Sequence, residues 1–115
     1  MRRLLFLLIS AVLTVAAADL SGKWPGTLET DRGTDQHSLA LQQNGNAVTG
    51  TVAFSDGKWE IRNAKLTGTK LGFEITVGSW VLHYDLQVSG NEISGTVKAD
   101  SGPFPGGKVR FQRGS

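Results

Sequence analysis

The sequence contains no cysteine and only three prolines among its 115 residues. Without cysteine the chain can form no disulfide, and it lacks thiolate metal ligands and cysteine nucleophiles. Helical periodicity is also missing, because no long window places apolar residues three and four positions apart. The chain must therefore be stabilised by hydrophobic burial between strands.

Positive charge is in surplus only at the N-terminus. The formal net charge is +2, and Arg2 and Arg3 supply two of the 12 basic residues, so ten basic residues remain against ten acidic ones. Residues 19–115 contain no cluster of lysine and arginine that could follow a phosphate backbone. The charge pattern therefore predicts no nucleic-acid partner.

Residues 1–18 have the three parts of a secretory signal peptide. Arg2 and Arg3 form a basic start, residues 4–15 are apolar, and three alanines at 16–18 form a small-residue cleavage site. The apolar run is too short for a stable transmembrane helix. We expect cleavage before Asp19, a periplasmic or secreted product, and no membrane attachment after cleavage. The alternative is an uncleaved membrane anchor.

Two stretches of the chain, forty-five positions apart, are copies of each other. Residues 39–54 read LALQQNGNAVTGTVAF, and residues 84–99 read YDLQVSGNEISGTVKA. Each is an alternation of apolar and polar residues, a Gly-Asn turn and a second alternation, which is the pattern of a β-hairpin. A weaker third copy covers residues 66–73. A chain of hairpins must close its sheet or pair two sheets to protect its edges.

The alternation continues through residues 19–115 and predicts eight or nine short strands joined by tight turns. We predict one all-β domain over this range, an antiparallel up-and-down meander of about eight strands closed into a small lipocalin-like barrel. A two-layer β-sandwich is the alternative. The predicted inward-facing residues are Trp24, Leu28, Leu39, Leu41, Val48, Val52, Phe54, Trp59, Ile61, Leu66, Leu71, Phe73, Ile75, Val77, Trp80, Leu82, Tyr84, Leu86, Val88, Ile93, Val97, Val109 and Phe111.

Neither histidine is predicted to belong to a catalytic or metal site. His83 points outward by strand parity with Asp85 on the same face, but metal ligation usually needs three or four ligands. His37, beside Asp35 near the start of a strand, is likewise predicted to be a solvated polar residue. The carboxylates fall on outward positions, and no nucleophile motif is present. We therefore predict a protein that is not an enzyme and has no metal or cofactor.

Aromatic residues are the candidates for ligand binding. Trp59, Phe73, Trp80 and Tyr84 face the predicted interior, where Tyr84 is the only polar group. A barrel of this size is either filled by side chains or holds one small ligand, and its many aromatic residues favour filling. The preferred function is binding of a small apolar molecule in one end of the barrel. The alternative is a filled barrel acting as a surface interaction or inhibitor module for a protein partner, with Phe104, between two prolines, as the contact.

The opening of the predicted domain resembles the small exported bacterial barrels of calycin type. The matching segments are SGKWPG (21–26), LALQQ (39–43) and VTGTV (48–52). The Gly-x-Trp of this opening resembles the signature with which lipocalins close the base of their barrel, and the resemblance implies a barrel over most of residues 20–113. The opening is also distantly similar to the avidin family. Pro25 and Val52 replace that family's biotin-binding asparagine and aromatic residue, so this similarity does not imply biotin binding. Bacterial metalloprotease inhibitors of the same barrel type share the opening, which is the source of the inhibitor alternative.

Overall fold

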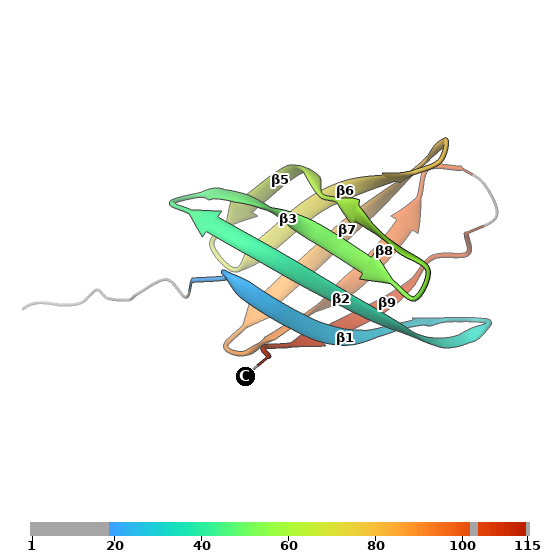
Figure 1. Cartoon of the computed structure of the whole chain (residues 1–115), viewed down its shortest axis with the longest axis horizontal. Helices are drawn as coiled ribbons and strands as arrows, with labels where there is room; N and C mark the ends of the chain where they lie inside the picture. The colour runs from blue at the N-terminus through green and yellow to red at the C-terminus, as the bar shows by residue number, and fades with distance from the viewer. Residues whose placement is uncertain (1–18, 102–103, 115) are drawn as a thin grey trace, which may run out of the picture.

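The computed structural model describes residues 19–101 and 104–114, so the predicted signal peptide at 1–18 lies outside the described residues. Within the described ranges, no helix is long and apolar enough to cross a membrane. The elements are nine strands (Figure 1). Their bounds are β1 (Gly22–Thr30), β2 (Gly33–Asn44), β3 (Ala47–Phe54), β4 (Gly57–Glu60), β5 (Arg62–Thr67), β6 (Lys70–Val77), β7 (Trp80–Ser89), β8 (Glu92–Ala99) and β9 (Gly107–Gln112).

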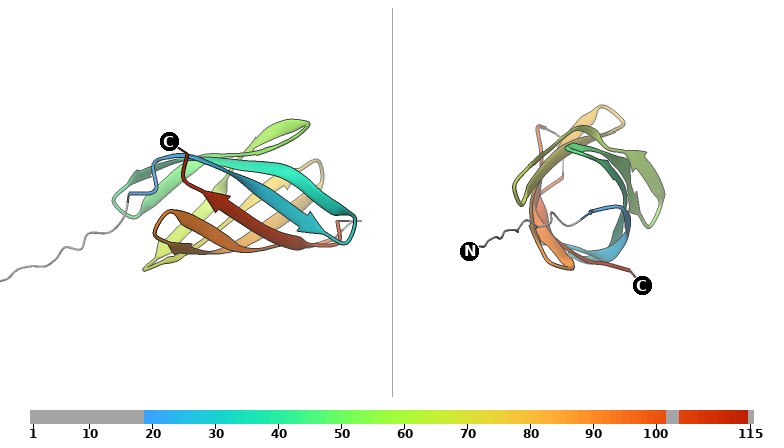
Figure 2. Two further views of the ribbon diagram at one scale, coloured as in Figure 1. Left: turned by 90° about the horizontal axis from the view of Figure 1, so that it is seen from below. Right: turned by 90° about the vertical axis from the view of Figure 1, so that its left-hand side faces the viewer.

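All nine strands belong to one antiparallel sheet in the order β4-β3-β2-β1-β9-β8-β7-β6-β5. The first and last strands pair with each other, so the sheet curls into a ring when viewed along its axis (Figure 2). Among the described strands, only the seam between β4 and β5 lacks a strand pairing. Beside this seam, the amide of Ile61, which joins β4 to β5, donates a hydrogen bond to the Gly50 carbonyl of β3 at 2.9 Å. The fold is therefore a nearly closed barrel. The predicted fold class is confirmed, and the sandwich alternative is wrong because the strands form a single sheet.

The repeated hairpins have the same register in space. In β2 and β3 Leu41 lies opposite Gly50, and in β7 and β8 Leu86 lies opposite Gly95. Both repeats bury the apolar residues of their alternation and leave the threonines on the outer face at least partly exposed to solvent. The internal repeat of the sequence is therefore a structural repeat of two equivalent hairpins.

The glycines at Gly50 and Gly95 allow neighbouring strands to approach closely. A Cβ atom on Gly50 would collide with the carbonyl of Ala40, and one on Gly95 would collide with the carbonyl of Asp85. Strand parity places both glycines inward, where the sequence predicts either a bulky neighbour such as a tryptophan or sharp coiling of the strand. The nearest neighbour in the structure is the backbone of the adjacent strand and not a bulky side chain. These glycines allow the tight coiling that a narrow barrel requires.

Side chains fill the barrel along most of its length. Leu20 is buried although it precedes the first strand, and Trp80 is 37% exposed although it has inward parity, so both residues differ from the prediction. The buried apolar residues are Leu20, Trp24, Leu28, Leu39, Leu41, Val48, Val52, Ile61, Leu71, Phe73, Ile75, Leu82, Tyr84, Leu86, Val88, Ile93, Val97, Val109 and Phe111. The remaining predicted core residues are half-buried.

Trp24 closes one end of the barrel. Its ring is completely buried, and its Nε1 donates a hydrogen bond to the Leu20 carbonyl at 2.9 Å. The guanidinium of Arg113 lies 4.4 Å from the centre of the Trp24 ring and donates hydrogen bonds to the carbonyls of Ser21 and Asp19. A cation over the indole face is favourable, and here it also ties the two ends of the domain together. We call this the closed end.

Candidate functional site: a pocket at the barrel mouth

The end of the barrel opposite Trp24 is formed by the β1–β2, β3–β4 and β6–β7 turns and the described residues of the β8–β9 connection, at the right of Figure 1. We call this end the mouth. β1 runs from the closed end to the mouth. The strands that follow these turns, β2, β4, β7 and β9, therefore start at the mouth and run toward the closed end. Residues at the ends of β3 and β6 and at the starts of β4 and β7 are therefore brought together here.

An apolar pocket of about 300 Å³ opens at this end, and we call it the mouth pocket. Phe54 and Trp59 reach it from the two sides of the β3–β4 turn, with their ring centroids 5.2 Å apart and their planes at 86°. Trp80 reaches it from the start of β7 and is the one exposed large apolar side chain among the described residues. The full lining is Arg32, Phe54, Asp56, Trp59, Val77, Trp80, Leu82, Phe104 and Pro105.

The floor of the mouth pocket is a closely packed aromatic layer. Phe54 in the pocket wall makes an edge contact with the ring of His37 at 4.4 Å. The Nε2 atom of His37 lies 2.9 Å from the hydroxyl of Tyr84, and Tyr84 stacks on Phe73 at 4.7 Å. Tyr84 and Phe73 are 3% and 4% exposed, so they close the barrel beneath the pocket. A ligand in the mouth pocket would rest on this layer rather than enter the barrel.

The prediction that His37 is solvated is wrong, because the side chain is only 2% exposed. His37 has the same strand parity as Leu39 and Leu41, so its side chain points inward with theirs. The alternation of side chains along β2 therefore indicates that His37 is buried. The predicted interior was apolar apart from Tyr84, whereas the structure contains a histidine–tyrosine pair.

Burial controls the electrostatics of this pair. It lowers the pKa of His37 from its usual 6.5 to about 4, against smaller opposing effects of the Ala53 backbone and the Asp35 carboxylate. The Ala53 backbone lies near the ring, but within the described part of the chain no group completes a hydrogen bond to His37 Nδ1. Burial also raises the pKa of the Tyr84 hydroxyl. Both groups are therefore neutral near pH 7, and the pair forms a hydrogen-bonded part of the core.

The structure brings three of the five candidate residues into one pocket and leaves two outside it. Trp59, Trp80 and Phe104 line the mouth pocket together, although Phe104 was expected to be a surface contact and is half-buried in the pocket wall. Phe73 and Tyr84 do not line the pocket and lie in the layer beneath it.

Two charged residues of the pocket, Arg32 and Asp56, were not singled out from the sequence. Each lies in a tight turn between two predicted strands, and these turns fall at the same end of a meander as the β6–β7 turn next to Trp80. The alternation of turns between the two ends of a meander therefore indicates from the sequence that both residues lie near Trp80. No ion pair involves either residue within the ranges that the structure describes.

His83 lies outside the mouth pocket, on the outer face of β7. Its expected neighbour was Asp85, but its ring nitrogens face Glu74 at 3.4 Å and Asp100 at 2.8 Å. The two carboxylates lie at opposite nitrogens of the ring, so they do not converge on one point. Residues 19–101 and 104–114 contain no group of three or more histidine, aspartate or glutamate side chains suited to a metal ion.

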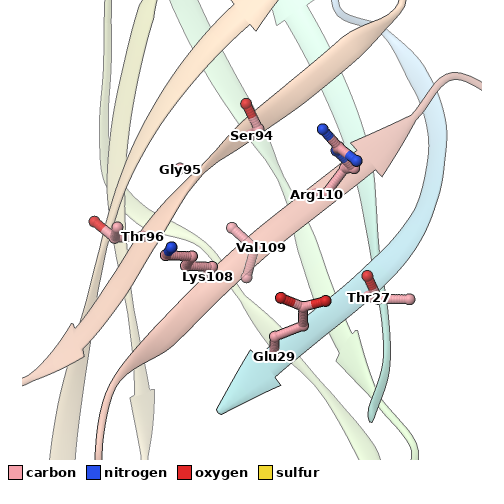
Figure 3. Close-up of a pocket in the computed structure, with 8 residues that line it drawn as sticks. All are labelled: Thr27, Glu29, Ser94, Gly95, Thr96, Lys108, Val109 and Arg110. Atoms are coloured by element: carbon pink, nitrogen blue, oxygen red, sulfur yellow. The ribbon is translucent and has the colours of Figure 1, made fainter. Parts of the chain in front are cut away.

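A larger depression, of about 500 Å³, lies on the outside of the barrel wall across β1, β9 and β8 (Figure 3). Its charged side chains, Glu29, Lys108 and Arg110, are exposed, and Arg110 Nε contacts Glu92 at 3.2 Å. The remaining lining residues are Thr27, Ser94, Gly95, Thr96 and Val109. Mixed charges and hydroxyls on an exposed strand face form a solvated surface, so we place the candidate site at the mouth.

Solved structures with a similar fold include three β-barrels. An abundant heat soluble (SAHS) protein from Ramazzottius varieornatus has a TM-score of 0.57 at 18% identity and covers 86% of this chain and 98% of its own. The fatty-acid-binding protein from Manduca sexta has a TM-score of 0.55 at 8% identity, with coverages of 83% and 99%. Fatty-acid-binding protein 1 from Echinococcus granulosus has a TM-score of 0.56 at 12% identity, with coverages of 84% and 98%. No protein-family model and no curated protein sequence matches the chain. These likenesses support the fold alone, a nearly closed antiparallel β-barrel.

Proposed function

We propose that this protein binds a small apolar molecule in the mouth pocket. The observation that carries the proposal is the convergence of apolar side chains from separate turns around one open space of about 300 Å³. Trp80 remains 37% exposed at this space, and a ligand would cover it. Exposed apolar surface gathered in a concave site is the usual mark of a ligand pocket.

The packed interior limits what the pocket can hold. The His37–Tyr84 layer closes the barrel below it, and its volume lies at the small end of the range for small-molecule sites. We therefore expect a compact ligand that is held at the end of the barrel. The fatty-acid-binding proteins among the fold neighbours add support for an apolar ligand and for a binding protein rather than an enzyme.

The test is titration of the neutral fluorescent probe phenylnaphthylamine into the parent protein and a Trp80→Ala variant. We expect the parent to bind the probe and Trp80→Ala to weaken binding about ten-fold, the usual effect of removing a central aromatic contact. Trp24→Phe is the matched control, because Trp24 lies at the closed end, and its affinity should stay near that of the parent. Circular dichroism verifies that each protein is folded. A parent that binds no probe, together with a Trp80→Ala variant that gains binding through a new cavity, would refute the proposal.

Export of the protein as a lipocalin-like barrel is a second part of the proposal. Its support is the signal-peptide pattern of residues 1–18 and the SGKWPG opening, whose tryptophan resembles the base of exported barrels. The product would lie in the periplasm or the medium. The intact mass of protein recovered there should correspond to a chain that begins at Asp19, and a mass that includes Arg2 and Arg3 would contradict export by cleavage.

A further inference from the structure

We infer that the ligand of the mouth pocket is a small lipophilic cation, such as a quaternary ammonium group on an apolar body. This inference rests on the proposed binding function and names its ligand class. It is carried by the aromatic rings that line the pocket and by the carboxylate among them.

Four aromatic side chains line the pocket and leave space between their rings. Phe54 and Trp59 stand at 86° to each other on the β3–β4 hairpin, which gives the pocket two adjacent ring walls. Trp80 and Phe104 come from β7 and the β8–β9 connection, and no ring pairing joins either of them to that hairpin in the described structure. The negative faces of aromatic rings attract cations, most strongly for tryptophan, and aromatic cages recognise quaternary ammonium groups.

A carboxylate among the aromatic rings favours a cation over an anion. Asp56 lines the pocket and has no ion-pair partner among the residues described. The other charges near this end do not line the pocket: Asp31 precedes Arg32 in the β1–β2 turn, Lys58 follows at the start of β4, and Asp100 contacts His83 on the outer face. The carboxylate of Asp56, set among the aromatic rings of the lining, attracts a positively charged ligand.

Arg32 is the one charge in the lining that opposes such a ligand. Its side chain is exposed, lies at the tip of the β1–β2 turn and is held by no ion pair within the described ranges. Because Arg32 and Asp56 line the same pocket, the positive charge of Arg32 would repel a ligand cation that is held near Asp56. Removing the Arg32 charge should therefore strengthen cation binding, whereas removing the Asp56 charge should weaken it.

The experiment displaces bound phenylnaphthylamine from the full chain with three competitors of similar size. These are phenethyltrimethylammonium, which is positively charged, phenylpropanol, which is neutral, and phenylpropionate, which is negatively charged. We expect the cation to displace the probe at a concentration about five-fold to ten-fold below that of the alcohol, as a cation between aromatic rings predicts. The carboxylate should be the weakest competitor.

Charge-removing variants assign the preference to the pocket. Asp56→Asn should weaken the cation about three-fold and leave the alcohol unchanged, which is the size expected for an exposed charge pair. Arg32→Gln should strengthen the cation by a similar factor. Asp85→Asn is the control, because Asp85 is exposed on the outer face of β7 away from the pocket, and it should have no effect.

The outcomes separate this inference from the function on which it rests. If the parent binds the probe but the carboxylate or the alcohol displaces it as well as the cation does, the cation inference is overturned and the binding function stands. An Asp56→Asn variant that behaves like Asp85→Asn toward the cation also overturns it. If the parent binds no probe, no competitor can displace it, and the proposed binding function itself is wrong.

Discussion

The two tryptophans at opposite ends of the barrel should respond very differently to truncation. Trp24 is completely buried, and its removal would leave a cavity, an unpaired Leu20 carbonyl and an Arg113 side chain without its ring. Truncation of a buried aromatic residue costs about 3–5 kcal/mol, so we expect Trp24→Ala to lower the free energy of unfolding by that amount. Trp80 is 37% exposed and borders an existing pocket, so Trp80→Ala should cost about 1–2 kcal/mol.

The measurement is urea unfolding followed by far-ultraviolet circular dichroism, because tryptophan fluorescence changes with the substitutions themselves. A small domain has a total stability of about 5–15 kcal/mol, so Trp24→Ala could leave too little folded protein for analysis. Trp24→Phe supplies the second variant, since it keeps a ring beneath Arg113 but loses the hydrogen bond to Leu20, and it should cost about 1–3 kcal/mol. If Trp24→Ala and Trp80→Ala lower the free energy of unfolding equally, the assignment of one structural end and one binding end is refuted.

Two further predictions concern the core and the strand backbone. Burial lowers the pKa of His37 from 6.5 to about 4, so between these values the unfolded chain binds a proton that the folded chain does not. The free energy of unfolding should therefore fall by up to about 3 kcal/mol as the pH drops through this window. His37→Gln should flatten this slope in urea unfolding at a series of pH values, and an unchanged slope would contradict the burial effect. Gly95→Ala should lower the free energy of unfolding by about 1–3 kcal/mol because its Cβ would meet the backbone of β7. Gly72→Ala should change it little, because its Cβ would make only an ordinary contact, 3.7 Å from the Tyr84 carbonyl oxygen. Thermal unfolding compares the two variants, and equal midpoints would exclude the close approach.

Much of the local structure follows from the sequence because strand signals are local. The period-two alternation determines which side chains share a face, and Gly-Asn dipeptides between alternating runs determine the hairpin turns. The repeat of residues 39–54 at 84–99 therefore predicts two equivalent hairpins, and the structure gives both the same register. His37 follows the same alternation along β2, so its position in the strand indicates burial even though its side chain is polar.

The tertiary structure decided how the faces meet around the barrel. Parity assigns Trp80 to the inside, but its exposure follows from its place at the end of a strand, where the barrel opens. Trp59, Trp80 and Phe104 are separated in the sequence and share a pocket only because the β1–β9 pairing closes the sheet. The same closure places His37 beside Tyr84, forty-seven positions away. Closure depends on the summed twist and stagger of all the strands, a property of the whole sheet that no single stretch of sequence encodes.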